Sequence, residues 1–189
     1  MKFKSKFLML MISFATAFFI SACSGDQAEN AGKESSGDHS SHANMEHSGS
    51  GEIPEGLKNE ENPAYKVGSK AVIIEDHMPG MDGAEATIVG AYDTVVYSLS
   101  YDPTNGGLRV ENHKWVIHEE LKDAGDQPLK AGDEAIINTD HMEGMKGAKA
   151  VIDTAEQTTV YMVDFTPTDG SEKVTNHQWV TESELSSAK

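Results

Sequence analysis

The sequence predicts an all-β protein in which two tandem small β-barrels follow a disordered tether. The first observation is a duplication: residues 76–84 return as 140–148, and residues 112–116 return as 176–180, at one constant offset. The second is that each copy consists of short apolar runs separated by turns rich in glycine. The third is that no segment carries the sustained apolar stripe of an amphipathic helix. Many short strands in a small repeat favour a barrel.

The N-terminal segment has the features of an export signal rather than of a folded domain. Three lysines precede an apolar run over residues 7–20, which is short for a membrane span. The run ends in Ile-Ser-Ala-Cys, which looks like a bacterial lipobox with Cys23 as the lipidated residue. An ordinary secretory signal with a chance cysteine is the alternative. We expect removal of residues 1–22 and anchoring of Cys23 to the cell membrane, on its extracytoplasmic face.

Composition excludes several classes of function. Cys23 is the single cysteine, so no thiol remains for a disulfide, a thiolate metal site or a nucleophile. The net charge is −16, and losing three lysines with the signal makes it about −19. Such an acidic chain lacks the clustered Lys and Arg that the phosphate backbone of a nucleic acid requires.

Residues 23–57 are expected to form a flexible tether. Their first part is rich in Ser, Gly, Asp, Glu, Asn and His and has almost no large apolar residue, so it cannot offset the entropy lost on folding. His39, His42, Met45 and His47 form a short tract that packing does not require. Short histidine-rich tracts commonly bind metal ions.

The first repeat, residues 58–125, is expected to contain about five short strands. Apolar runs or apolar alternation mark the strands, and residues 102–107 are dense in turn formers. The expected strands are residues 71–74, 84–88, 94–101, 108–110 and 112–117, with 120–121 closing the unit. The order of turns is similar to that of SH3-like and KOW-type barrels.

The second repeat, residues 126–189, is expected to form the same barrel. One unit of this size is small for independent stability, so we expect the two repeats to pack against each other.

The duplicated loop contains the chemistry that points to function. His77, Met78 and Met81 supply imidazole and thioether groups, the soft donors that favour copper and above all Cu(I). Glycines at 80 and 83 let the loop turn back sharply, which could bring His77 and Met81 together and leaves Met78 the weaker candidate. The alternative is that the methionines fill gaps in the core and that His77 stabilises a turn.

The distribution of histidine favours the metal interpretation. Four of the eight histidines are the duplicated pairs, and only His118 stands outside both the pairs and the tether. His113 and Trp115 fall on the same side of a strand, so His113 could complete the site of the loop or remain a hydrogen-bonded edge residue. For the tryptophans we favour a role as core anchors. The candidate metal ligands are His77, Met78, Met81, His113, His141, Met142, Met145 and His177.

Catalysis has little support in the sequence. There is no nucleophile-elbow serine, no HExxH, no P-loop and no dinucleotide fingerprint, so no catalytic residue is assigned and an enzyme is not expected.

The paired H-M-x-G-M-x-G-A and N-H-x-W-V motifs, with the lipobox and the tether, resemble the YdhK-type lipoproteins of Gram-positive bacteria. Their relatives include CopL-type lipoproteins associated with copper resistance. This resemblance implies a surface-anchored protein that lowers the free copper reaching the cell. The expected partners are copper ions and the membrane, together with a copper exporter or the cell wall. One alternative is an SH3-like module that binds the cell wall or a protein through Tyr97, Tyr101, Phe165 and the tryptophans. Another is a purely structural envelope protein.

Overall fold

The computed structural model of the chain describes residues 48–188. The expectations for the signal peptide, for Cys23 and for the His39, His42 and His47 tract lie outside the described residues. Among the residues described, no helix is long and apolar enough to cross a membrane.

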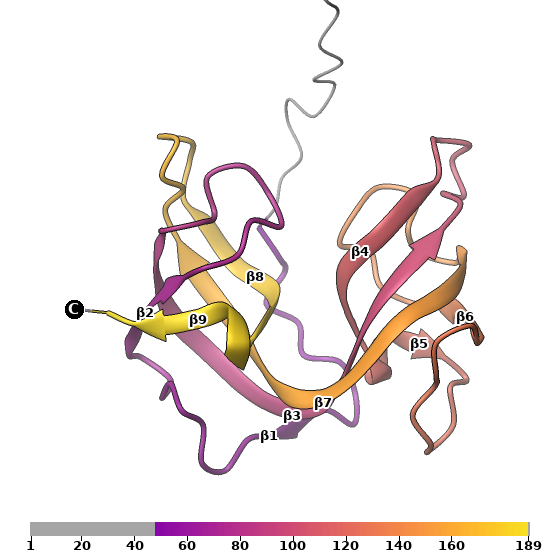
Figure 1. Ribbon diagram of the computed structural model, residues 1–189, viewed down its shortest axis with the longest axis horizontal. Coiled ribbons are helices and arrows are strands. Elements are labelled where there is room, and N and C mark those ends of the chain that lie inside the picture. Colours follow the sequence, from indigo (N-terminus) through magenta and orange to yellow (C-terminus); the bar gives the residue numbers. More distant parts are fainter. Residues whose placement is uncertain (1–47, 189) are drawn as a thin grey trace, which may run out of the picture. The chain divides into compact units, whose positions relative to one another are not determined.

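The all-β class predicted from the sequence is confirmed, and residues 48–188 contain no α-helix. Two single turns of 3₁₀-helix interrupt the strands (Figure 1). In chain order the elements are β1 (Lys58–Asn59), β2 (Lys70–Ile73), β3 (Glu85–Tyr101), β4 (Val110–Ile117), η1 (His118–Glu120), β5 (Leu121–Lys122), β6 (Glu134–Ile137), β7 (Lys149–Phe165), β8 (Val174–Thr181), η2 (Glu182–Glu184) and β9 (Leu185–Ser187).

The nine strands form one open antiparallel sheet rather than two separate closed barrels. Its main path runs β5-β6-β7-β3-β2-β9, while β1 and β4 also pair with β3 and β8 also pairs with β7. The sheet of the described residues does not close on itself, so the SH3-like barrels predicted from the sequence are not confirmed.

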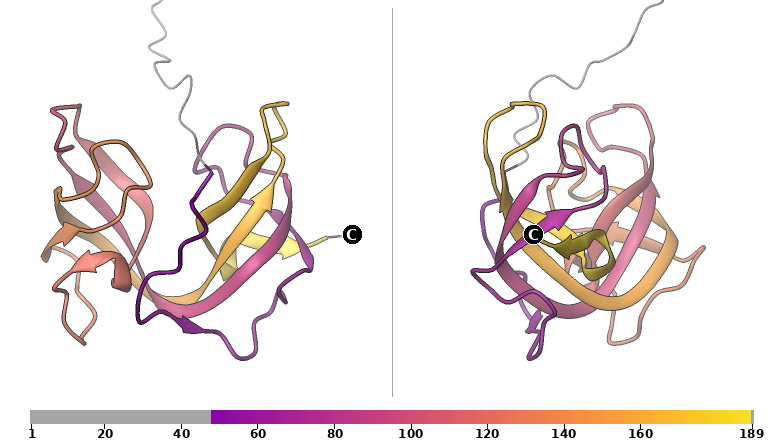
Figure 2. Two further views of the ribbon diagram at one scale, coloured as in Figure 1. Left: turned by 180° about the vertical axis from the view of Figure 1, so that it is seen from behind. Right: turned by 60° about the vertical axis from the view of Figure 1, so that its left-hand side comes forward.

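The centre of the sheet is a long ribbon of β3 and β7, 17 residues each. The two strands expected at 84–88 and 94–101 are one continuous strand, because residues 89–93 contain no turn. Its pairing with β7 shifts register next to Gly90 and between Ser98 and Leu99. Thr94 pairs with Thr158, its own counterpart in the second repeat, so an approximate two-fold axis passes through this pair. The two strands stay side by side along their length in all views (Figure 2).

The hydrophobic cores combine halves of different repeats. The first core packs Ile73 and Met81 of the first repeat against Phe165 of the second, and the second core packs Tyr97 against Met145. All five side chains are at most 1% exposed, and burying each contributes roughly 1.5–3 kcal/mol. A third, central core contains Trp115 and Trp179. The sequence repeats, 58–125 and 126–189, are therefore not the units that pack.

Residues 48–57, which the sequence assigns to the tether, run along β8. The Gly49 amide donates to the Thr175 carbonyl over 2.9 Å, and the Gln178 side chain donates to the Glu52 carbonyl over 3.0 Å. Leu57 packs on the central core. This segment extends the second repeat on the side where β8 carries His177 and Trp179.

Candidate metal centre

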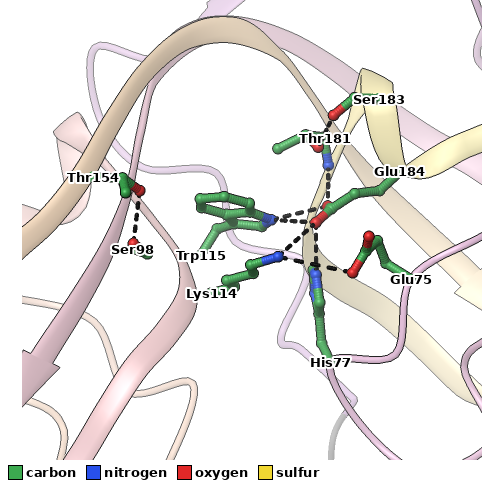
Figure 3. Close-up of polar contacts among 9 residues, drawn as sticks. All are labelled: Glu75, His77, Ser98, Lys114, Trp115, Thr154, Thr181, Ser183 and Glu184. Atoms are coloured by element: carbon green, nitrogen blue, oxygen red, sulfur yellow. Dashed lines mark hydrogen bonds and ion pairs between the residues drawn. The ribbon is translucent and has the colours of Figure 1, made fainter.

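A buried carboxylate, Glu184, organises the surroundings of His77. The 3₁₀ turn η2 folds Glu184 back over the end of β8, where it accepts a hydrogen bond from the Thr181 amide at 2.9 Å. His77 Nε2 lies 2.7 Å from Glu184 Oε1, and the indole N–H of Trp115 donates to both carboxylate oxygens at 3.0 and 2.9 Å (Figure 3). These contacts join a loop and a strand of the first repeat to a carboxylate of the second.

Glu184 is held in its ionised form. Burial by itself would raise its pKa, but hydrogen bonds from His77, Thr181 and Trp115 outweigh it, so the pKa lies below the usual value of a glutamate. An ionised carboxylate only accepts hydrogen bonds, so Nε2 of His77 carries the proton of that bond.

The same arrangement recurs around Glu120. His141 Nε2 lies 2.8 Å from Glu120 Oε1, while the Trp179 indole and the Ile117 amide each donate to Glu120 Oε2 at 3.1 Å. We call His77, Glu184 and Trp115 the first cluster, and His141, Glu120 and Trp179 the second cluster. In each cluster the carboxylate comes from one repeat and the other two residues from its counterpart.

Each cluster leaves one buried imidazole nitrogen without a hydrogen-bond partner among the described residues. Nδ1 of His77 and Nδ1 of His141 are shielded from solvent and make no hydrogen bond to any described residue. A buried acceptor without a donor costs about 1–3 kcal/mol. By contrast, His118 has both nitrogens satisfied, by the Tyr97 hydroxyl and by the Gly125 carbonyl, each at 2.8 Å.

His113 adds a further nitrogen to the second cluster. Its Nε2 is buried and makes no hydrogen bond within residues 48–188. Burial, and then the charges that His141 and His77 would carry if protonated, lower the pKa of His113 to about 4, although Glu120 acts in the opposite sense. His113 is therefore neutral at pH 7. Its ring centre lies 6.5 Å from that of His141.

The sequence grouped His113 with His77 and Met81 of its own repeat. The structure brings the His113 ring next to His141, in the loop of the other repeat, because β4 packs on the second core. His177, the counterpart of His113, is half-buried with its ring 5.7 Å from that of Phe165. Which of these side chains bind a metal stays a prediction.

The four loop methionines fall into two kinds. Met81 and Met145, which the sequence favoured, are fully buried in the first and second cores. Met78 and Met142, which the sequence placed lower, are half-buried at the margins of the same cores. The Met142 sulfur accepts a hydrogen bond of 3.8 Å from Tyr101, whose ring also contacts His113. Position therefore favours Met78 and Met142 as accessible thioethers.

Glu75 gives the first cluster an additional oxygen donor. Donor atoms of Glu75, His77 and Glu184 all lie within 4.8 Å of one another. The Lys114 ammonium stands beside them, 3.8 Å from Glu75 Oε2 and 3.9 Å from Glu184 Oε1 (Figure 3).

The sequence reasoning missed Glu120 and Glu184 as members of the site. Their signal was present, since both return at the offset of the histidines, but an acidic residue near a chain turn is ordinarily solvated. The tryptophans are buried in the central core as expected, and their indole N–H groups donate hydrogen bonds to these carboxylates.

Comparison with known proteins places the chain beside proteins of unknown function. The family described as "Protein of unknown function (DUF1541)" matches residues 67–118 and 131–182. An uncharacterized protein, YdhK of Bacillus subtilis strain 168, is 55% identical over 186 residues, which are 96% of this chain and 89% of that protein.

Solved structures of the same Bacillus protein agree with the fold. One crystal structure of this DUF1541 protein is 62% identical, covers 76% of this chain and 97% of its own, and superposes with a TM-score of 0.73. A solution structure of the YdhK C-terminal domain is 64% identical, covers 65% of this chain and 92% of its own, and has a TM-score of 0.62.

Proposed function

The chain belongs to the DUF1541 family, and we propose that it is a lipid-anchored, extracytoplasmic protein that binds and sequesters copper as Cu(I). The family description names no activity, so the support comes from the chemistry of the two clusters. The resemblance to CopL-type copper-resistance lipoproteins is part of the same proposal.

The observation that carries the proposal is a pair of buried imidazole nitrogens without a hydrogen-bond partner among the described residues, His113 Nε2 and His141 Nδ1. The ring centres lie 6.5 Å apart. Two imidazoles that share one ion through metal–nitrogen bonds of about 2 Å have ring centres roughly 5–6.5 Å apart. The spacing therefore suits two nitrogens on opposite sides of one ion, and binding would remove the cost of both unsatisfied acceptors.

The donor set points to copper rather than to a hard cation. Met142, adjacent to His141 in the chain, adds a thioether on the Tyr101 side of His113. Imidazole and thioether donors select Cu(I), whereas calcium and magnesium require oxygen ligands. Glu120 would support His141 as a ligand by accepting a hydrogen bond from its Nε2. A carboxylate on the ring nitrogen that does not bind the metal fixes the tautomer of the imidazole and makes the imidazole more basic.

The corresponding set around the first cluster is His77, Met78 and His177. Met81 and Met145 lie inside the cores and support the loops by packing. In the proposal, Cys23 carries the lipid that holds the protein at the membrane, and a copper exporter or the cell wall is its neighbour there.

The alternative function, a module that binds the cell wall or a protein through exposed aromatic side chains, has less support. Tyr97 and Tyr101 are 0% exposed and Phe165 is 1% exposed. Trp115 and Trp179 are buried in the central core. These five side chains therefore do not line an open groove.

The proposal is tested by titrating the mature protein with Cu(I) under anaerobic conditions, against a chelator that absorbs light when it binds copper. We expect the wild type to withdraw copper from the chelator. His113→Ala and His141→Ala should each weaken binding by at least about tenfold, because a two-nitrogen site loses half of its imidazole donors. His118→Gln is the matched control and should leave binding unchanged, since His118 has its own hydrogen-bond partners.

The methionines provide a second matched pair. Met142→Leu should weaken Cu(I) binding, while Met145→Leu, a conservative change inside the second core, should not. A wild-type protein that leaves all copper on a weak chelator would overturn the proposed function.

A further inference from the structure

The first and second clusters differ at the positions that surround the carboxylate. Beside Glu184 stand the acidic Glu75 and the cationic Lys114, whose ammonium lies 3.8 and 3.9 Å from the two carboxylates. The positions that correspond to Glu75 and Lys114 in the second repeat are Thr139 and Gln178, and both are uncharged.

We infer that Lys114 is a specificity-determining residue that keeps metal out of the first cluster, so that each chain holds one copper ion, at the second cluster. This inference rests on the proposed function, because it decides which of the two duplicated sites is loaded. The number of copper ions per chain is then one, and Lys114 is the residue that determines this number.

Lys114 already serves as the cation of the first cluster. Both its ammonium and the Nε2 of His77 lie near Oε1 of Glu184, at 3.9 and 2.7 Å. The two nitrogens are therefore within about 7 Å of each other. An ion on Nδ1 of His77 would lie one ring width and one metal–nitrogen bond further away, within about 11 Å of the ammonium. At that distance and at an effective dielectric constant of about 20, a unit positive charge weakens binding of a cation by about tenfold.

The position of Lys114 is maintained by more than the carboxylates. Its ammonium also lies 5.1 Å from the centre of the Trp115 ring, within the range of a cation–π contact. Lys114 is only about one-third exposed, with a side-chain accessibility of 32%, which limits the screening of its charge by water.

The second cluster has no such cation. Within residues 48–188, the ion pair of Glu120 is with His141, and no lysine or arginine joins it. Gln178 donates its side-chain N–H to the Glu52 carbonyl at 3.0 Å, in the segment that runs along β8. An ion between His113 and His141 would therefore meet the negative charge of Glu120 without a competing ammonium.

The experiment counts the Cu(I) equivalents that the full mature chain retains against a chelator of intermediate affinity. We expect one equivalent for the wild type and two for Lys114→Gln, with affinity at the first cluster increased at least about tenfold. Lys114→Arg is the matched control, because it keeps the charge and should retain one equivalent. Circular dichroism and a melting curve show that each variant is folded.

Two further variants locate the ions. His141→Ala should remove the single equivalent of the wild type. In the Lys114→Gln background, His77→Ala should remove the gained equivalent. The reciprocal change, Gln178→Lys, should weaken the wild-type equivalent about tenfold by placing an ammonium near Glu120.

If the wild type retained two equivalents of Cu(I) with equal affinity, the inference would be overturned while the proposed function would remain intact. Folded Lys114→Gln protein that still retains one equivalent would do the same. Failure of every variant to retain copper would instead overturn the proposed function, and the inference with it.

Discussion

The two clusters share the same buried hydrogen bonds among histidine, glutamate and tryptophan, which we call the skeleton. They differ in the residues that surround these three, which we call the margin. The histidine-to-glutamate distance is 2.7 Å in the first and 2.8 Å in the second, and the tryptophan-to-glutamate distance is 2.9 and 3.1 Å. Around this skeleton Glu75 corresponds to Thr139, Lys114 to Gln178 and Phe165 to Tyr101. Each buried polar atom of the skeleton depends on the others, so the skeleton tolerates little change, whereas the residues at the margin can differ between the two copies.

The largest expected effect comes from removing a carboxylate of the skeleton. Glu184→Ala leaves His77, the Trp115 N–H and the Thr181 amide without their acceptor, and we expect a loss of about 4 kcal/mol in the free energy of unfolding. Glu120→Ala should cost about as much. Urea denaturation measures both, with the exposed Glu75→Ala as control. A loss below about 1 kcal/mol in either variant would show that the skeletons are not equivalent in stability.

Acid should destabilise the metal-free protein through His113. The folded-state pKa of about 4 lies below the ordinary 6.5, so the unfolded chain binds the proton first as the pH falls. The stability from the neutral imidazole is complete above pH 6.5 and is lost progressively toward pH 4, about 3 kcal/mol in total. Urea denaturation at several pH values checks this. His113→Phe should remove that part of the pH dependence, and an unchanged slope would contradict the assignment.

Exchanging the aromatic residue at the margin should have a smaller effect. Tyr101→Phe gives the second copy the residue of the first and removes the hydrogen bond to the Met142 sulfur. We expect a loss of about 0.5–1 kcal/mol in stability and a modest gain in Cu(I) affinity, because the sulfur no longer accepts a hydrogen bond. Melting curves and the copper competition assay report the two effects. Weaker copper binding would indicate that the hydroxyl orients the thioether for the metal.

The smallest effect on stability is expected from the margin of the first cluster. Glu75→Thr together with Lys114→Gln recreates the residues of the second copy, and the ion pair removed is partly exposed and long, at 3.8 Å. Such pairs contribute about 0–1 kcal/mol, so the melting temperature should change little. A large loss of stability would show that Lys114 belongs to the skeleton and not to the margin.

The sequence predicted the β class and the duplicated histidines, because periodicity and repetition are written in the order of residues. It did not predict that each of the first two cores combines side chains of both repeats. Residues 84–88 and 94–101 have the pattern of two strands, and only the pairing with β7 shows that they are one. The alternation of Tyr97, Leu99 and Tyr101 does place all three in a core, yet that core is completed by the other repeat.

The candidate site was predicted in part for the same reason. His113 and His77 belong to the same repeat, so they were grouped, but the fold brings the ring of His113 next to that of His141. Met81 was favoured over Met78 because loop geometry alone cannot show which sulfur faces the core. Glu184 is distant from His77 in the chain, and no local pattern indicates that a carboxylate beyond β8 will accept a hydrogen bond from His77.

The pairing of β3 with β7 also determines when the chain can fold. The first core needs Tyr161 and Phe165, and β2 gains its second neighbour only when Ala71 meets Ser187 in β9. The second core likewise waits for residues 137–152. Contacts of such long sequence separation slow folding, because a large loop must close before they can form. A chain made from its N-terminus therefore completes neither core until its second repeat has been synthesised, and His77 can meet Glu184 only after that repeat is nearly complete.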